Sequence, residues 1–466
     1  MRLRFGVLAI VILVIASACG SSGGDDNASG SGDLEGGNTS TTVSNKADCE
    51  GKTLTSPEVG VTDKEITVTV LADVDNPIKP ALFEGSWNGV KAWADYMNAN
   101  GGLACRQVVV KTRDSKLSGE EAKNAVAAAC GDSVALVGTT ALFLQDVSGM
   151  EGCKDKAGAA TGLPDIADLQ TEATQQCSKI SFATLPNSSG CPYSGSGPRD
   201  FKVGQTQYDY YLKTNPDLHG VFVIPKDLPS TIASTMPIFR AENKMGIKSD
   251  AEFGVSGTAT QPEYTQVVQA MKTNKSNYAR NGLDYSGTVL MRKEAAAQGV
   301  DTVKVWDCSV QCYDKRLISE GGSAVEGQYV WLNILPMEDG EGVNPTLDAF
   351  LKYNKKPDGF GAQAFVAGMI FAEAVNKAMA ANGGDPNAIT RSNLLTAIRG
   401  IEGFTAGGMI PPTNIGKKQG SVCLVGLQVK DGKFVRVSPT EPGKFDCGGN
   451  KPPVELNIDP VKEYKG

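Results

Sequence analysis

The chain has 466 residues, of which 41% are hydrophobic and 21% are charged, and its formal net charge is -7. This length supplies enough apolar residues for roughly one to three domains with full hydrophobic cores. No basic stripe with interleaved aromatic residues is visible, which argues against a nucleic acid as a partner. His219 is the only histidine, and no metalloprotease, phosphate-loop or dinucleotide motif accompanies it. We therefore expect no enzyme activity, no cofactor and no metal.

The N-terminus has the pattern of a secretory signal. Two arginines among the first four residues precede an apolar run at residues 7–15, which is too short to span a bilayer. Small residues then lead to Cys19, in a pattern that resembles a bacterial lipobox except that Ala16 stands where leucine is usual. We expect a lipoprotein signal peptide over residues 1–18, with Cys19 as the lipidated N-terminus that anchors the protein to the cell membrane. The alternative is a plain signal peptide that is cut before an ordinary cysteine.

Residues 19–50 are mainly glycine, serine, aspartate, asparagine and threonine. A segment of this composition cannot bury enough apolar surface to fold. We therefore predict a flexible tether between the lipid anchor and the folded part of the chain.

Eleven cysteines support an oxidising, extracytoplasmic location. Setting Cys19 aside leaves an even number, which favours disulfides, although sequence alone does not fix their pairing. The pairs that we favour are Cys308 with Cys312, Cys105 with Cys130, Cys423 with Cys447, and Cys153 with Cys177. Metal binding would be the alternative, but no CxxC pair or histidine cluster supports it.

The first part of the chain alternates predicted strands and helices. A helix that begins at Phe83 carries an apolar face through Trp87, Val90 and Met97, and Asn100 with two glycines ends it. Predicted strands lie at residues 66–71, 107–111, 134–138, 162–167 and 179–184, and a second helix lies at 120–130. This order of elements indicates a parallel sheet that is covered by helices.

After a segment rich in serine, glycine and proline at residues 187–198, the alternation starts again. Helices are predicted at residues 205–213, 263–273 and 288–298, and strands at 220–224, 252–256 and 303–307. A strand at 327–334, helices at 361–382 and 393–401, and a hairpin with its turn at Asp431-Gly432 follow. The long helix contains Glu373 and Lys377, which argues against a membrane span. The whole order predicts two α/β lobes.

Several motifs in this order resemble those of one family. They are VTDKEITV at residues 61–68, the Asn-Gly-Gly stop at 100–102, GTT at 138–140, GLP at 162–164 and LQVKDGKFV at 427–435. From about residue 60 to 440, the chain resembles type I periplasmic solute-binding proteins. More narrowly, it is similar to the branched-chain amino acid (Leu/Ile/Val) binding family of ABC importers.

The resemblance implies an α/β fold with two doubly wound, Rossmann-like lobes that are joined by three crossovers. The crossovers would lie near Pro186, residues 332–336 and residues 416–420. Lobe I would then comprise residues 51–186 and 332–416, lobe II residues 187–331 and 417–442, and a C-terminal tail residues 443–466. The hinge of such proteins needs no oligomer, so we expect a monomer.

Ligands of open α/β sheets bind beyond the carboxyl ends of the strands. The loops at those ends are residues 73–76, 139–142 and 168–171 in lobe I, and 225–230, 281–285 and 306–309 in lobe II. The candidate ligand-binding residues in these loops are Asp75, Thr139, Thr140, Ala141, Leu169 and Thr171 of lobe I, and Asp227, Asp284, Tyr285 and Asp307 of lobe II.

The resemblance suggests roles for four of these residues. Thr139 and Thr140 would hold the α-carboxylate of the ligand through hydroxyl and backbone N–H groups, and a simple helix cap is the alternative. Asp307 would meet an ammonium group, with Asp284 as a second candidate. For both aspartates, the alternative is an ordinary solvated carboxylate.

The function implied by the resemblance is that of a lipid-anchored, extracytoplasmic protein that captures a small molecule and delivers it to an ABC permease. The expected ligand is an amino acid or a related amide, and a sensor module that reports to a receptor is the alternative function. Two departures keep a urea, a small peptide or an aromatic compound open as ligands. Residues 225–230 replace an aromatic-glycine pair that is frequent in the family, and the segment 187–198 is atypical.

Overall fold

The computed structural model describes residues 49–76, 79–186, 190, 191, 193, 195 and 197–465. All of these residues belong to one unit that spans residues 38–466. The predicted signal peptide at residues 1–18, the predicted lipidation site Cys19 and residues 20–48 of the predicted tether lie outside the described residues.

Lobe I is built on a five-stranded sheet in the order β2-β1-β3-β4-β5, in which all neighbouring strands are parallel. Its strands are β1 (Glu65–Ala72), β2 (Gln107–Asp114), β3 (Ala135–Thr139), β4 (Asp165–Ala167) and β5 (Ser181–Ala183). Every residue of β3 is buried, as expected of a parallel strand that helices cover on both faces.

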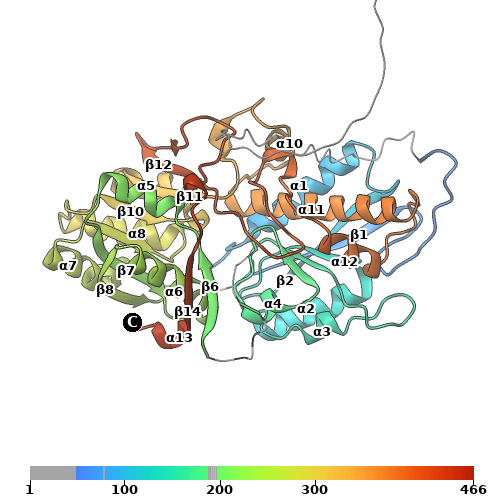
Figure 1. Cartoon of the computed structure of the whole chain (residues 1–466), viewed down its shortest axis with the longest axis horizontal. Helices are drawn as coiled ribbons and strands as arrows, with labels where there is room; N and C mark the ends of the chain where they lie inside the picture. The colour runs from blue at the N-terminus through green and yellow to red at the C-terminus, as the bar shows by residue number, and fades with distance from the viewer. Residues whose placement is uncertain are drawn as a thin grey trace, which may run out of the picture. The chain divides into compact units, whose positions relative to one another are not determined.

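The helices of lobe I include one long core helix. They are α1 (Glu84–Ala99), α2 (Gly119–Asp132), α3 (Ser148–Glu151), α4 (Ala173–Cys177), α10 (Pro345–Tyr353), α11 (Gly359–Ala381) and α12 (Arg391–Arg399). Among the described residues, α11 is long and apolar enough to cross a membrane. However, it packs against α1, and Val366, Ile370 and Phe371 have no exposed surface (Figure 1). It is therefore the core helix of lobe I.

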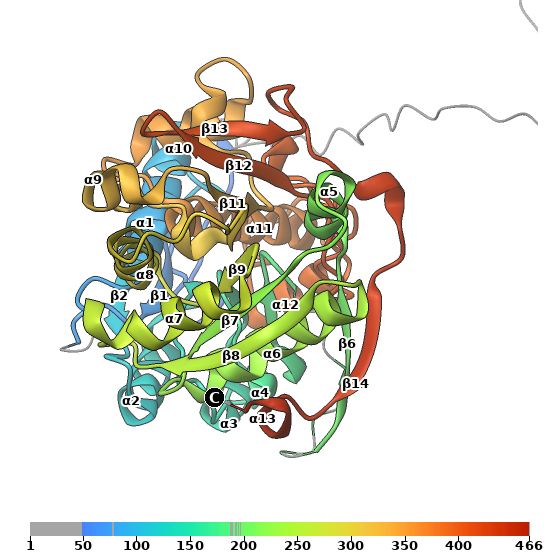
Figure 2. The same cartoon turned by 90° about the vertical axis from the view of Figure 1, so that its left-hand side faces the viewer.

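Lobe II is built on a seven-stranded sheet in the order β13-β12-β11-β10-β9-β7-β8. Its strands are β7 (His219–Pro225), β8 (Lys248–Val255), β9 (Tyr278–Asn281), β10 (Val305–Cys308), β11 (Gln328–Leu332), β12 (Val425–Lys430) and β13 (Lys433–Ser438). The neighbouring strands β8, β7, β9, β10 and β11 are parallel to one another. The β12–β13 hairpin adds two antiparallel strands beside β11. Figure 2 shows this lobe toward the viewer.

The helices of lobe II cover its sheet. They are α5 (Thr206–Thr214), α6 (Pro229–Lys244), α7 (Thr265–Asn274), α8 (Tyr285–Ala297) and α9 (Lys315–Gly321). Short 3-10 helices lie in both lobes at Gln261–Tyr264, Val310–Cys312, Gly322–Val325, Met337–Asp339, Ala406–Gly408 and Gly448–Asn450.

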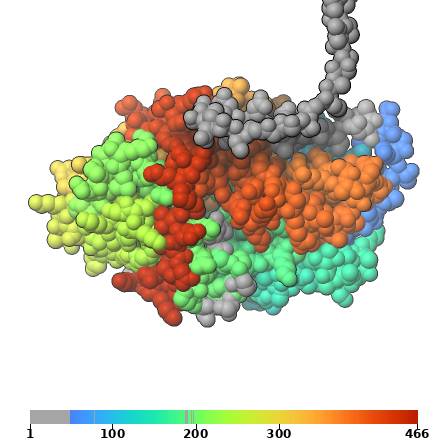
Figure 3. All heavy atoms as spheres, viewed as in Figure 1, coloured from blue at the N-terminus to red at the C-terminus, as the bar shows by residue number. Residues whose placement is uncertain are grey.

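The chain crosses between the two sheets three times, from β5 to lobe II, from β11 to α10, and from α12 to β12. The first crossover leads into β6 (Arg199–Val203), which pairs in antiparallel fashion with β14 (Val454–Ile458). The sequence assigns residues 443–466 to a tail, and in the structure they contain β14 and α13 (Pro460–Glu463). Figure 3 shows this C-terminal segment, in red, running over the surface between the lobes.

The predicted fold class, an α/β fold with two parallel-sheet lobes, is confirmed. The main elements that sequence reasoning missed are β6, β9, α6 and β14. Pro237 stands inside α6, and prolines in a helix interior normally argue against a helix. Strand β9 carries a buried arginine, Arg280, that interrupts its apolar pattern.

Five disulfides join the described cysteines. They are Cys49–Cys105, Cys130–Cys153, Cys177–Cys191, Cys308–Cys312 and Cys423–Cys447. The structure therefore contains two of the expected bridges, but the expected Cys105–Cys130 and Cys153–Cys177 pairs are replaced by others. Arg391 explains one replacement, because its guanidinium donates to the carbonyl oxygens of Cys130 and Lys154 and holds these two segments together.

The contact between α1 and α11 leaves no room for a side chain at Gly89. A Cβ placed there would lie 2.0 Å from the carbonyl oxygen of Gly361, which is backbone and cannot rotate away. Helices approach this closely only where both carry glycine or another small residue. The packing of lobe I therefore depends on this pair of glycines.

We predict that Gly89→Ala lowers the free energy of unfolding by about 2–3 kcal/mol, because the helices must separate to admit the methyl group. Gly131→Ala is the matched control, since Gly131 lies in α2 and a Cβ added there would meet no atom within 4 Å, and it should stabilise by about 0.5–1 kcal/mol. Urea denaturation of both variants provides the measurement. Equal stabilities for the two variants would contradict this account of the interface.

Candidate functional site

A cavity of about 760 Å³ lies between the two lobes. Its walls come largely from the loops that follow all five strands of lobe I and β7, β8, β9 and β10 of lobe II. The crossovers close one side through Pro186, Gly420 and Ser421, and the C-terminal segment contributes Pro453. The cavity thus lies where the carboxyl ends of the two sheets face each other, which is the usual binding position in open α/β sheets.

The wall of the cavity is largely apolar. Lobe I contributes mainly leucine and phenylalanine, namely Leu82, Phe83, Leu117, Leu142, Phe143, Leu169 and Phe360. Lobe II contributes Leu228, Ile238, Leu283 and Val310, beside polar side chains such as Thr231, Ser234, Thr235, Asn281 and Gln311. The lobe I side chains and Leu228 form one apolar cluster, so the cleft has its own hydrophobic lining, separate from the cores of the lobes.

Asp73, the first residue after β1, organises the lobe I wall. Its buried carboxylate accepts hydrogen bonds from the Ser115 hydroxyl at 2.7 Å, from Leu117 N–H at 2.7 Å and from Leu142 N–H at 2.8 Å. Burial raises the pKa of Asp73, while these three donors act in the opposite direction. Two of the leucines in the cavity wall are therefore fixed by one carboxylate.

An ion pair joins the lobes at the cavity. Lys79 Nζ, from lobe I, lies 3.1 Å from the Asp284 carboxylate of lobe II and donates to the Ser286 hydroxyl at 2.6 Å. Asp284 also caps α8 by accepting a hydrogen bond from Gly287 N–H. Both charged side chains remain about one-fifth exposed, so water screens the pair.

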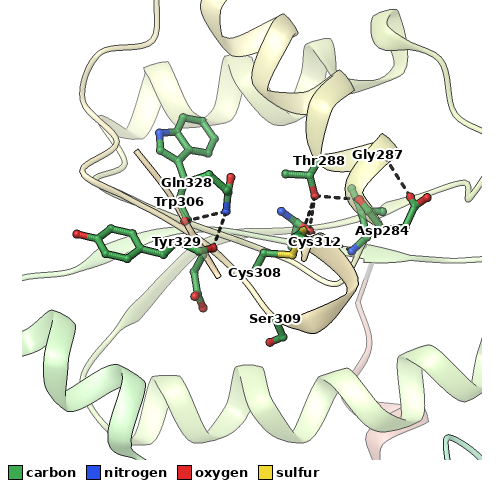
Figure 4. Close-up of a disulfide and its surroundings, with 12 residues drawn as sticks. Asp284, Gly287, Thr288, Trp306, Cys308, Ser309, Cys312, Gln328 and Tyr329 are labelled. Carbon is green, nitrogen blue, oxygen red and sulfur yellow. Dashed lines mark hydrogen bonds between the residues drawn. A yellow bond between two sulfur atoms is a disulfide. The ribbon is translucent and has the colours of Figure 1, made fainter. Parts of the chain in front are cut away.

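The Cys308–Cys312 disulfide closes the loop that forms part of the lobe II wall. Ser309, Val310 and Gln311, which lie between the two cysteines, all line the cavity. Figure 4 shows the bridge beside the start of α8, with the Thr288 hydroxyl 3.1 Å from the Cys312 sulfur. Both cysteines are fully buried, so the bridge supports the loop from behind.

Three comparisons relate this chain to known proteins. A family model described as periplasmic binding protein matches residues 211–433. A substrate-binding protein of an ABC transporter from Aeropyrum pernix superposes with a TM-score of 0.67 at 13% identity, and the match covers 86% of this chain and 98% of that one. No curated protein matches the chain.

Two further solved structures superpose at similar quality. One is a fatty acid ABC transporter substrate-binding protein from Thermomonospora curvata, with a TM-score of 0.62, 17% identity and coverage of 81% of this chain and 92% of that one. The other is a leucine binding protein from Thermotoga maritima, with a TM-score of 0.61, 15% identity and coverage of 85% and 99%.

The chain has the type I periplasmic-binding-protein fold. The matched family consists of extracytoplasmic binding proteins, and it is not a family of enzymes. Among the described residues, no group of three or more histidine, cysteine or acidic side chains could hold a metal.

The periplasmic-binding-protein fold brings four of the ten candidate residues to the cavity. Leu169, Thr171, Asp227 and Asp284 line it. Tyr285 lines a smaller adjoining cavity of about 200 Å³. The remaining candidates, Asp75, Thr139, Thr140, Ala141 and Asp307, line neither cavity.

The hydroxyl groups of Thr139 and Thr140 act inside lobe I. Thr139 Oγ1 donates to the Asp165 carboxylate at 2.7 Å, and Thr140 Oγ1 donates to the Gly138 carbonyl at 2.8 Å. Neither threonine has exposed surface. Because a hydroxyl has a single proton to donate, these groups do not supply the expected carboxylate site.

Asp307 lies inside lobe II and does not face the cleft. Its carboxylate pairs with the Arg280 guanidinium and accepts hydrogen bonds from Tyr211 Oη at 2.6 Å, Tyr278 Oη at 3.1 Å and Gln207 Nε2 at 3.2 Å. Its side chain is 0% exposed. An ammonium group of a ligand therefore does not reach it, which corrects the role that the resemblance suggested.

Sequence reasoning missed the residues that shape the cavity most. Lys79 and Arg280 line it as cations, and Leu142, Phe143 and Leu228 supply its apolar surface. For Leu142, Phe143 and Leu228, the available signal was their place shortly after a predicted strand, whereas Arg280 lies in β9, which the sequence did not predict. Apolar residues in these loops carry no specific signal, because apolar side chains are usually buried in the protein itself.

Glu242 completes the buried cluster around Arg280. One oxygen of its carboxyl group lies 3.1 Å from Arg280 Nε, and the other lies 3.0 Å from Tyr278 Oη. Burial raises the pKa of Glu242 to about 8, Asp307 also raises it, and Arg280 acts in the opposite direction. In the folded protein, Glu242 therefore stays protonated at pH values where it ionises in the unfolded chain.

We predict that Glu242 makes stability fall as the pH rises. Its folded-state pKa of about 8 lies above the ordinary value of 4.5, so its contribution is complete below about pH 4.5 and is lost as the pH rises through about 8. Glu242→Gln, which carries no titrating proton, should flatten the decline of the urea midpoint between these pH values. The exposed Glu441→Gln is the control, and equal slopes for the two variants would contradict the prediction.

Proposed function

We propose that this chain is the solute-binding component of an ABC importer, which captures a small molecule between its lobes and delivers it to a permease. The observation that carries the proposal is the cavity of about 760 Å³ that both lobes wall with the loops at their strand ends. A ligand there touches both lobes at once. Such a ligand favours the closed arrangement over an open one, because it gains contacts only when the lobes meet.

We infer the permease partner and the extracytoplasmic location from the similarity of residues 211–433 to periplasmic binding proteins, not from the cavity. A permease that distinguishes the closed from the open form receives a loaded protein in preference to an empty one. The lipid anchor at Cys19 belongs to this proposal, since a tethered binding protein stays near its permease. A module that reports to a receptor would use the same closure, and it remains the alternative.

The ligand class is a separate matter from the fold. Solved structures with this fold include a leucine binding protein and a fatty acid transporter component, which differ widely in ligand. The sequence suggests an amino acid or related amide. Thr171, Asp227 and Asp284 line the cavity and are the candidate polar contacts that we retain.

We predict that Ser234→Trp abolishes ligand-induced stabilisation without unfolding the protein. Ser234 lies on α6 and lines the cavity, and its hydroxyl makes only a local bond to the Thr231 carbonyl among the described residues. The indole would fill space that the ligand needs. The measurement is a thermal-shift screen with amino acids, amides, alcohols, carboxylic acids and aromatic compounds, where a ligand at a hundredfold excess over Kd stabilises by about 2.7 kcal/mol.

The matched control is Ser392→Trp, which places the same side chain on the exposed face of α12, away from the cavity. This variant should respond to ligands as the unmodified protein does. Small-angle X-ray scattering with and without the best ligand tests lobe closure. Binding that survives Ser234→Trp, or binding without a change in dimensions, would argue against an interlobe solute site.

We predict that Asp284→Asn raises the Kd of the best ligand from that screen by up to about fivefold. Asparagine keeps the helix cap on α8 but removes the charge that pairs with Lys79, and a partly exposed pair contributes at most about 1 kcal/mol. Lys79→Met should give the same loss. Titration calorimetry measures the ligand affinity of both variants. If the double variant binds the ligand more weakly than either single variant, the two residues do not act as a pair.

A further inference from the structure

We propose that the cavity takes a predominantly hydrocarbon ligand, an acyl chain or ring system with one uncharged polar end, and not a free amino acid. This inference rests on the proposed function and names the ligand class for the same site. It depends on three properties of the cavity: its apolar wall, the pairing of its charges and one buried hydroxyl without a partner.

Apolar side chains from both lobes face the space without being covered by protein. Leu82, Leu117 and Phe143 of lobe I and Leu228 and Ile238 of lobe II are only partly buried, although they line the cavity. Their remaining surface is the part that a ligand would cover. Apolar surface on opposite walls favours a ligand that is apolar along its body.

The cations that line the cavity are already paired. Lys79 pairs with Asp284 at 3.1 Å, whereas the Lys202–Glu455 pair at 3.2 Å across the β6–β14 ribbon is exposed to solvent and weak. Arg280 is held by Asp307 inside lobe II. An anionic head group would have to compete with a protein carboxylate for Lys79 and for Arg280.

The anions of the wall are occupied as well. Asp284 is taken by Lys79, and the Asp227 carboxylate accepts hydrogen bonds from the Ser256 hydroxyl at 2.7 Å and from Gly257 N–H at 3.0 Å. The charges that would hold both ends of a zwitterion are therefore engaged by the protein. Leaving a charged end unpaired in an apolar cavity is costly, so the wall selects against free amino acids.

Thr171 lines the cavity, and its hydroxyl has no hydrogen-bond partner among the described residues. Thr171 Oγ1 is buried and accepts or donates no hydrogen bond there, and Thr171 is 6% exposed. An unsatisfied buried hydroxyl costs free energy, which a ligand oxygen or nitrogen would recover. A single neutral hydroxyl suits a single uncharged end, such as an alcohol, an amide or an ester.

The volume agrees with this class. A cavity of about 760 Å³ falls within the roughly 300–1,000 Å³ of pockets that hold drug-sized ligands. A free leucine would fill only part of it and would leave apolar wall against water. A longer hydrocarbon body covers both walls at once.

The test is calorimetric titration with n-alkanols, the matching n-alkanoates, leucine and leucinamide. For alkanols of roughly six to ten carbons, Kd should fall about fourfold with each added methylene, as expected for full burial of each CH₂. Leucine and leucinamide should bind more weakly than the longest alkanol. If leucine binds more tightly than the longest alkanol, or if no alkanol binds, the ligand is not of the hydrocarbon class. If alkanoates bind more tightly than the matching alkanols, the polar end of the ligand is charged.

Two variants test separately how the protein recognises the hydrocarbon body of the ligand and its polar end. Leu228→Gln should reduce the gain per methylene, and Ile238→Gln serves the same purpose if the first variant does not fold. Thr171→Val, which keeps the shape of the side chain, should weaken every alkanol by a similar factor without changing that gain. Leucine binding that Ser234→Trp abolishes would refute this inference while leaving the proposed solute-binding function intact, so the two failures are distinguishable.

Discussion

The carboxylate of Asp73 accepts hydrogen bonds from Ser115, Leu117 and Leu142, and so ties together the ends of β1, β2 and β3. Each of these strands ends in an irregular loop that is not ordered by helix or sheet hydrogen bonds. A buried acceptor with three donors gives the loops one common arrangement. The leucines that follow are thereby held toward the cleft, so the hydrophobic wall depends on a charged residue that does not line it.

The same division of labour recurs in lobe II. Asp307 and Tyr278 lie near the strand ends, bond to partners inside the lobe and do not line the cavity, whereas Leu228, Ile238, Leu283 and Val310 face the cleft. The fold places its ligand beyond the carboxyl ends of the strands, whatever residues stand there. The scaffold therefore determines where a ligand binds, and the inward or outward direction of each polar side chain determines what kind.

The direction in which each polar side chain points could not be predicted from the sequence. The order of strands and helices followed from hydrophobic patterns, because runs such as residues 134–138 are apolar throughout. Asp307 lies at the end of a predicted strand, but successive side chains of a strand point to opposite faces, and the face was decided by Arg280, 27 residues earlier in β9. Cys49 escaped notice for a similar reason, since its partner is remote in sequence and its neighbours are polar.

Each of the three crossovers between the lobes is held to at least one lobe by specific contacts. The first is tied to lobe I by the Cys177–Cys191 bridge and to lobe II by the β6–β14 ribbon, whose continuation α13 packs on α6 and ends in the Glu463–Arg240 pair. In the second, Asp339 is paired with Arg436 of β13, and in the third, Lys418 donates to the carbonyl oxygens of Gln176 and Ser178. Because every crossover is braced against a lobe, the closure that the proposed function requires would be a rotation of two rigid lobes, and a ligand that touches both walls would favour its closed end point.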